Sequence, residues 1–172
     1  LCGTMSVGKT TLVNALKETK QFKKYNFATE RSKYLSDLGI PLNTDSTLKG
    51  QTVFLAERCA ELMNNDIITD RTVIDVMAFT MNAKSIGHYD KEIFESYAKE
   101  FIREYDYIFY ISPHGIPMED NGVRETDEHY RDIIDFTITT LIKKYGHMAN
   151  KIEKISGSTD ERVEQILKFT NL

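Results

Sequence analysis

Close to the start of the chain, one segment fits the phosphate-binding loop pattern G-x-x-x-x-G-K-[ST] at every specified position: Gly3-Thr4-Met5-Ser6-Val7-Gly8-Lys9-Thr10. In such a loop the two glycines allow tight backbone turns, so that successive N–H groups point inward and form an anion-binding hollow at the start of a helix. The apolar spacing of Leu12, Val13 and Leu16 predicts that helix directly after the loop. A glycine-rich turn that matched by chance would lack this continuation. We therefore expect the chain to hold a nucleotide through its phosphates.

The last residues of this segment have separate expected roles. Lys9 would reach the β- and γ-phosphates as a movable point charge. The Thr10 hydroxyl would be a ligand of the Mg²⁺ ion that bridges those phosphates, and Thr11 would continue the loop into the helix beside the nucleotide. ATP and Mg²⁺ are therefore the expected cofactors, bound by residues 3–11.

Composition limits the class of protein. The chain has 172 residues, of which 41% are hydrophobic, so we expect one domain spanning 1–172 with a single well-buried core. The net charge is −4 and the 22 basic residues are scattered, which argues against duplex nucleic acid as a partner. Cys2 and Cys59 are far apart and the four histidines lack metal-ligand spacing, which favours a reducing, cytoplasmic setting without disulfides or zinc. No apolar stretch has the length that a membrane span requires.

Segments typical of strands and of helices alternate along the chain. Strands are expected at 25–28, 67–69, 107–112 and 151–155, and Leu1-Cys2 is interpreted as the end of a first strand that begins before this sequence. Helices are expected at 10–19, 46–64, 73–86, 91–104 and 126–145, and a last helix begins at Ser158, which has capping-box spacing with Glu161. The alternation predicts an α/β fold of three layers, with a five-stranded parallel sheet between helices.

Two of the expected helices show apolar faces that we assign to the core. On 46–64 the face consists of Leu48, Thr52, Leu55, Cys59 and Leu62. On 91–104 it consists of Phe94, Tyr97, Ala98, Phe101 and Tyr105. The segment after the strand 107–112 is the most loop-like of the chain, and we interpret 113–131 as a lid.

Charged residues follow the second and third strands, where ligands of parallel sheets bind. Asp70 is placed to hold Mg²⁺ through its water shell, and Arg71 could bind a phosphate or carboxylate of an acceptor. A local ion pair or a charge at a helix N-terminus is the alternative for both residues. Glu30 is a candidate general base, and Arg31 beside it is a candidate substrate ligand, with a solvated strand end as the alternative. Asp75, one turn beyond Arg71, is expected to be an i,i+4 partner or to compensate the helix dipole rather than to take part in catalysis.

Two further sets of residues are candidates for nucleotide contacts. Arg124 and Arg131 are seven residues apart, so on one continuous helix they would share a face beside the lid and could stabilise the transferred phosphate. Exposed arginines on an amphipathic helix are the alternative. Gln51 and Arg58 share a face of the helix 46–64, and a glutamine amide can pair with the edge of a base. A polar flank on a core helix explains the same pattern.

With these residues in view, the chain resembles the P-loop nucleoside and nucleotide kinases, and most of all the AAA-type kinases related to the nicotinamide-riboside kinase domain, including many phage-encoded members. The resemblance spans most of the chain and rests on the loop 3–10, Glu30 with Lys33, Asp70-Arg71 with Asp75, and Gly122-Val123-Arg124 with Arg131. That family tends to have arginine where this chain has Lys33. The Asp70-Arg71 pair is similar to the one that thymidylate kinases use for Mg²⁺ and the acceptor phosphate, and Gln51 looks like the base-reading glutamine of deoxynucleoside kinases.

We expect a small-molecule kinase that moves the γ-phosphate of ATP to a nucleoside or a nucleoside monophosphate. Arg31 and Arg71 lean slightly toward a monophosphate, and Glu30 toward a nucleoside. A polynucleotide 5′-kinase is an alternative, although the sequence shows no basic, aromatic groove for single strands. A nucleotide-binding ATPase or regulatory switch without a small acceptor is the other alternative, and a homodimer stays open.

Overall fold

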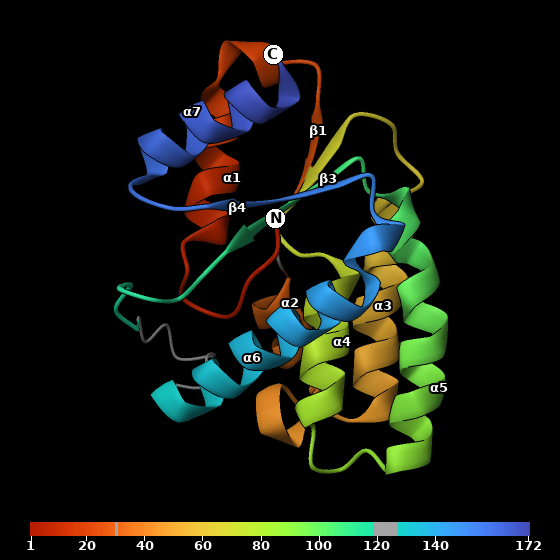
Figure 1. Cartoon of the computed structure of the whole chain (residues 1–172). Helices are drawn as coiled ribbons and strands as arrows, with labels where there is room; N and C mark the ends of the chain where they lie inside the picture. Colours follow the sequence, from red (N-terminus) through yellow and green to blue (C-terminus); the bar gives the residue numbers. More distant parts are fainter. Residues whose placement is uncertain (30, 119–126) are drawn as a thin grey trace.

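The computed structural model describes residues 1–29, 31–118 and 127–172, and Figure 1 shows its helices and strands alternating along the chain. The helices are α1 (Lys9–Glu18), α2 (Ser32–Asp37), α3 (Leu48–Glu61), α4 (Val73–Asn82), α5 (His88–Ala98), α6 (Glu128–Tyr145) and α7 (Thr159–Thr170). The strands are β1 (Asn26–Ala28), β2 (Ile67–Thr69), β3 (Tyr107–Ile111) and β4 (Lys151–Ile155). Short 3₁₀ turns cover Lys20–Phe22, Asn43–Asp45, Lys99–Glu104 and Gly146–Met148. Within the described ranges, no helix combines the length and apolar composition that crossing a membrane requires.

The strands pair in parallel as two ladders, β1 with β2 and β3 with β4. Leu1 and Cys2 lie between the ladders, because the Leu1 nitrogen donates to the Thr69 carbonyl at 2.6 Å and the Cys2 N–H donates to the Phe109 carbonyl at 2.9 Å. The predicted five-stranded sheet is not confirmed, since the described residues form two separate two-stranded sheets. Cys2 makes one isolated bridge, to Tyr110, and a single bridge does not amount to a strand.

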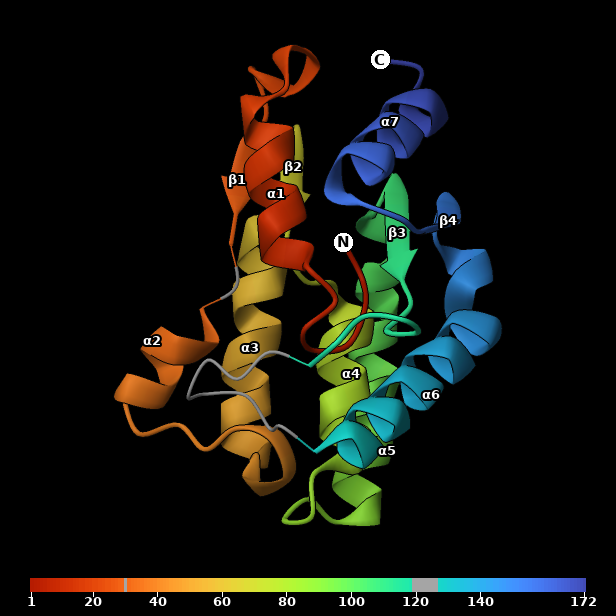
Figure 2. The same cartoon turned by 90° about the vertical axis from the view of Figure 1, so that its left-hand side faces the viewer.

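Buried clusters cover both faces of the strands, which produces the predicted layers. Along β3, Ile108 and Tyr110 belong to the cluster that contains side chains of α3, α4, α5 and α6. Phe109 and Ile111 alternate with them and belong to the cluster that contains side chains of α1 and α7. Figures 1 and 2 show α1 and α7 together on one side of the strands and the other long helices on the opposite side. A strand enclosed on both faces is characteristic of α/β proteins with parallel pairing.

Several helix boundaries follow from capping residues. Thr72 and Asp75 form a capping box at the start of α4, and Ser158 and Glu161 form the predicted one at the start of α7. At the start of α6, the Asp127 side chain accepts a hydrogen bond from a backbone N–H of the first turn. These local contacts explain why the sequence pattern located the helix starts within a few residues.

Other element predictions need correction. The helix expected at 73–86 ends at Asn82, and the helix expected at 91–104 is α5 followed by a 3₁₀ turn. Tyr97, assigned to the core, is 61% exposed, while Phe94 and Tyr105 are buried as expected. Helix α2 was not expected at all. It is only six residues long and places one side chain, Leu35, in the core, so its sequence carries little periodic signal.

The face of helix α3 that its leucines suggested is only partly confirmed: Leu55 is in the core and Cys59 and Leu62 pack against it, but the inward side is rotated toward other residues. Leu48 is 37% exposed and Thr52 is exposed, whereas Gln51 and Arg58 are 3% and 2% exposed. The buried residues of α3 are Gly50, Gln51, Phe54, Leu55 and Arg58. The face that points inward therefore contains both polar candidates of this helix, and polar side chains in such a position need partners.

Candidate active site

The phosphate loop leads directly into α1. Gly8 is the N-cap residue and has φ 81°, a left-handed conformation that glycine adopts without steric cost. Gly3 lies against the end of β3, where an added Cβ would stand 2.6 Å from the Ile111 carbonyl oxygen. At both positions a side chain would therefore be sterically unfavourable, which explains why the motif has glycine there.

The Lys9 side chain folds back onto its own loop. Its Nζ atom donates hydrogen bonds of 2.7 Å to the carbonyl oxygens of Gly3 and Thr4, and the residue is 7% exposed. Burial, together with the nearby Arg71 charge, lowers the pKa of Lys9 below its ordinary value. The predicted contact with the β- and γ-phosphates requires Nζ to exchange these carbonyl oxygens for phosphate oxygens.

Thr10 and Asp70 meet beside the loop. The Thr10 hydroxyl donates to Oδ2 of Asp70 at 2.5 Å, and Asp70, directly after β2, is 1% exposed. A hydroxyl and a carboxylate are hard oxygen ligands of the kind that Mg²⁺ prefers, and this ion usually keeps waters and substrate phosphates as its other ligands. No cluster of three or more His, Cys, Asp or Glu side chains suited to a metal occurs among the described residues. The pair fits a Mg²⁺ ion held mainly by phosphates and water.

The Asp75 carboxylate connects α4 to the loop. Its Oδ1 accepts a hydrogen bond from the Gly3 N–H at 2.9 Å, and its Oδ2 accepts from the N–H and the hydroxyl of Thr72 at 2.8 and 2.7 Å. Asp75 is completely buried. It is therefore a capping acid at the helix N-terminus, which is one of the roles expected for it, and in addition it positions the start of the loop.

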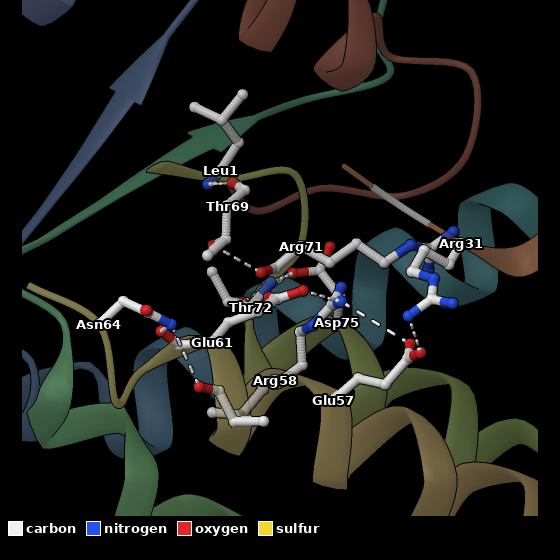
Figure 3. Close-up of polar contacts among 12 residues, drawn as sticks. Leu1, Arg31, Glu57, Arg58, Glu61, Asn64, Thr69, Arg71, Thr72 and Asp75 are labelled. Atoms are coloured by element: carbon white, nitrogen blue, oxygen red, sulfur yellow. Dashed lines mark hydrogen bonds and ion pairs between the residues drawn. The ribbon is translucent and has the colours of Figure 1, made fainter. Parts of the chain in front are cut away.

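Three charged side chains of α3, those of Glu57, Arg58 and Glu61, form a largely buried group with Arg31 at its exposed edge, as Figure 3 shows. The Arg31 guanidinium lies 3.3 Å from Oε1 of Glu57, and Nη2 of Arg58 lies 3.9 Å from Oε2 of the same residue. Arg58 also donates a hydrogen bond to Glu61. Burial raises the pKa of Glu61, and the adjacent Arg58 charge opposes that shift. Glu57 thus links Arg31, in the segment between β1 and α2, to the inward face of α3.

Arg71 follows Asp70 directly, so it lies at the same carboxyl end of β2 as the candidate magnesium ligand. Its guanidinium carbon lies 5.0 Å from the centre of the Phe79 ring, over the ring face. The hydroxyl of Thr69 donates to the Arg71 carbonyl at 2.8 Å, which fixes the backbone of this turn. Asp70 and Arg71 therefore lie where the sequence placed them, next to the phosphate loop.

Gln51 lies on the inward face of α3, and no described residue is hydrogen-bonded to its side-chain amide.

The buried Tyr105 hydroxyl, which the sequence assigned only to the core, accepts a hydrogen bond from the Val73 N–H at 3.1 Å. Burial raises the pKa of Tyr105 well above its ordinary value, so this hydroxyl stays neutral. This hydrogen bond from Val73 to Tyr105, which lies just before β3, holds the first turn of α4 directly after Asp70 and Arg71.

The start of α6 lies against the phosphate loop. The Thr4 hydroxyl donates to the Arg131 carbonyl at 3.4 Å, and the Arg131 guanidinium, 8% exposed, donates to the Ile116 carbonyl at 2.8 Å. This arginine of the predicted lid is therefore close to the loop. Glu30 and Arg124, the candidate base and the other lid arginine, lie outside the described residues, as do Gly122 and Val123.

Two residues of this region were missed by the sequence reasoning. Glu57 flanks the apolar face that the leucines of α3 suggested, so no pattern singled it out. Arg162 of α7 donates from Nη1 to the Val7 carbonyl at 2.8 Å, a contact between residues 155 positions apart. The capping box at Ser158 located the start of α7, yet no local signal indicates toward which element Arg162 points.

Comparison with known proteins agrees with this geometry. The family model described as AAA domain matches residues 1–162. The chain belongs to this AAA domain family. The comparison with curated proteins found no match to this chain. Among solved structures it is similar to one described as deoxyadenosine kinase from M. mycoides with bound dCTP, with 17% sequence identity and a TM-score of 0.65, covering 99% of this chain and 96% of that chain. The expected P-loop kinase type of α/β fold is confirmed for this AAA domain protein.

Proposed function

We propose that this AAA domain protein is an ATP-dependent kinase that moves the γ-phosphate of ATP to a hydroxyl group of a nucleoside. The observation that carries the proposal is the Thr10–Asp70 contact of 2.5 Å at the end of the phosphate loop, which supports a role for these two residues as magnesium ligands. The fold similarity to a structure named as a deoxyadenosine kinase supports the same class of acceptor.

Each step of the transfer has a candidate residue. The loop N–H groups and Lys9 bind the donor phosphates, and a Mg²⁺ ion held by Thr10 and Asp70 would neutralise charge on the β- and γ-phosphate oxygens. The acceptor hydroxyl oxygen forms a bond to the γ-phosphorus while the bond from this phosphorus to the β,γ-bridging oxygen breaks, and ADP leaves. Glu30 is proposed to take the hydroxyl proton, and Arg131 with Arg124 to stabilise the transferred phosphoryl group.

The pairing of charges favours a nucleoside over a monophosphate. Arg31 is paired with Glu57, and Arg58 with Glu61, so two guanidiniums on the acceptor side already face carboxylates. A monophosphate acceptor would bring about two further negative charges and would have to displace Glu57 from Arg31. A neutral nucleoside makes no such demand. Monophosphates are the second candidate, because Arg71 follows the expected metal ligand directly and could bind a phosphate.

Steady-state ADP release tests this proposal, measured with MgATP against a panel of nucleosides and of nucleoside monophosphates. We expect at least one nucleoside to raise ADP release well above the rate without acceptor. Asp70→Asn, which keeps the size of the side chain but removes a charged metal ligand, should abolish that increase. ADP release that no acceptor stimulates would contradict the proposal and favour an ATPase or a regulatory switch.

A further inference from the structure

Arg162 of α7 contacts the backbone of the phosphate loop. It lies in the first turn of α7, it is 7% exposed, and its Nη1 donates to the Val7 carbonyl at 2.8 Å. The same Nη1 would stand 3.3 Å from a Cβ added to Gly8. The guanidinium therefore touches the Val7–Gly8 peptide, which joins the two residues directly before the lysine of the motif.

A guanidinium on this carbonyl also decides where the N–H of the same peptide points. In a trans peptide the C=O and N–H bonds point in opposite directions, and the described chain contains no cis peptide. With the Val7 carbonyl directed at α7, the Gly8 N–H is directed away from α7, toward the open side of the loop. No described residue accepts a hydrogen bond from this N–H. It is one of the unpaired donors at the start of α1, where an anion binds.

Because residue 8 is a glycine, the Val7–Gly8 peptide could rotate out of this orientation with little steric cost. Gly8 has φ 81°, and a residue without a Cβ allows its preceding peptide to rotate with little steric penalty. A hydrogen bond from a charged donor opposes that rotation, and it also polarises the peptide so that its N–H becomes a stronger donor. Arg162 is thus the group that can hold the Gly8 N–H in its binding direction.

We propose that Arg162 is a positioning residue that fixes the Val7–Gly8 peptide plane and thereby sets the affinity of the loop for the phosphates of a nucleotide. The proposal rests on nucleotide binding by the loop, as in the function proposed above.

The buried charge of Arg162 is not balanced by a carboxylate among the described residues. No carboxylate of the described chain lies within ion-pair distance of its guanidinium, although buried charges are ordinarily paired. Burial accordingly lowers the pKa of the Arg162 side chain. A phosphate bound on the far side of the same peptide would supply the missing negative charge and would favour this buried cation.

Calorimetric titration of MgATP and of inorganic tripolyphosphate tests the proposal with three variants. Arg162→Met removes the donor but keeps the apolar stem, and Arg162→Lys keeps the charge on a shorter side chain that reaches the carbonyl less well. Lys168→Met removes one positive charge from an exposed position on the same helix and serves as the control. We expect Arg162→Met to weaken both ligands about 10- to 30-fold, Arg162→Lys to be intermediate, and Lys168→Met to bind as the wild type does.

Kinetics separate positioning from a general loss of folded protein. The KM for ATP of Arg162→Met should rise about as much as the dissociation constant, while kcat at saturating ATP stays within about threefold and the acceptor KM is unchanged. If Arg162→Met does not fold, Arg162→Lys carries the test, and unchanged affinity in the folded variant overturns the proposal. A loss for ATP without a loss for tripolyphosphate would overturn it as well, because the contact would then act through the base. A wild type that binds neither ligand would overturn both this proposal and the proposed function.

Discussion

The Asp75 carboxylate of α4 accepts a hydrogen bond of 2.9 Å from the Gly3 N–H, so one buried acid joins the first residue of the phosphate loop to the helix that follows the Asp70-Arg71 pair. Its other oxygen accepts two hydrogen bonds from Thr72. The loop and the candidate metal ligand therefore share one support. A change at Asp75 should therefore affect the loop directly, through Gly3, and the Asp70-Arg71 turn through Thr72.

We expect Asp75→Asn to lower the free energy of unfolding by about 1–3 kcal/mol, because the amide nitrogen that replaces one oxygen accepts no hydrogen bond and leaves buried donors without a partner. Asp160→Asn is the matched control, since Asp160 lies in the first turn of α7 and is exposed. That change should stay within about 0.5 kcal/mol. Urea denaturation followed by circular dichroism measures both. Equal stabilities of the two variants would contradict the assigned role of Asp75.

Lys9→Ala should abolish phosphoryl transfer while the fold persists, because the loop backbone remains and only the cation at the β- and γ-phosphates is lost. The variant also loses the two hydrogen bonds from Nζ to the loop carbonyls, so a small decrease in melting temperature should accompany the loss of activity. The rate of ADP release and a thermal melt measure the two effects. Turnover at the wild-type rate would contradict the assigned role of Lys9.

The lowered pKa of Lys9 predicts how nucleotide affinity depends on pH. Phosphate binds the charged ammonium form, so the affinity for MgATP should fall as the pH rises through this lowered pKa, and the fall should begin below the ordinary lysine value of 10.5. Lys9→Arg stays charged over the same range. Its affinity at pH 8 is expected to be lower, because the geometry differs, but to change little between pH 8 and pH 10. A wild-type affinity that begins to fall only above pH 10.5 would be inconsistent with the lowered pKa.

One variant can distinguish a catalytic role of Arg131 from a purely structural one. If it stabilises the transferred phosphoryl group, Arg131→Ala should lower kcat about 10³-fold and leave the affinity for MgATP nearly unchanged. If its contact with the Ile116 carbonyl is its whole contribution, the variant should instead lose stability and keep its kcat. We expect the first result. Arg124→Ala provides the comparison for the other arginine of the predicted lid.

The acceptor class can be examined through Glu57 and Arg71. For a nucleoside acceptor, Glu57→Gln should change the acceptor KM by less than about tenfold, because the residue serves mainly to hold Arg31. For a monophosphate acceptor, the same change should lower the KM, since it releases Arg31 for the phosphate. Arg71→Ala should raise the acceptor KM in either case. Acceptor KM values at saturating MgATP distinguish these outcomes, and an Arg71→Ala enzyme with an unchanged KM would contradict the placement of this arginine.

Much of this arrangement could be predicted because its signals are local. The spacing from Gly3 to Thr10 locates the loop, and the short apolar runs before Asp70 and before Ser112 locate β2 and β3. The capping box at Ser158 locates α7. Each of these patterns is complete within about ten residues, so the sequence alone contains it.

The remainder depends on contacts between distant segments. The leucines of α3 correctly placed Leu55 in the core, whereas packing against the buried helix α4 also buries Gln51 and Arg58 and leaves Leu48 at the surface. Arg162 touches Val7 because α1 and α7 pack on the same side of the strands. No periodic pattern contains such a pairing. The five-stranded sheet was inferred from the alternation of strand-like and helix-like segments. That alternation does not show how many residues of Leu1-Cys2 pair with β3, and the structure has one such bridge, from Cys2 to Tyr110.

The most direct test of the central claim follows the label from ATP that carries ³²P in the γ-phosphate. The protein is incubated with labelled ATP, Mg²⁺ and an equimolar mixture of nucleosides and nucleoside monophosphates, and the labelled products are separated by thin-layer chromatography. The account predicts a labelled nucleoside monophosphate, because the γ-phosphate is transferred to a nucleoside hydroxyl. Labelled inorganic phosphate alone, or a labelled nucleoside diphosphate alone, would contradict it.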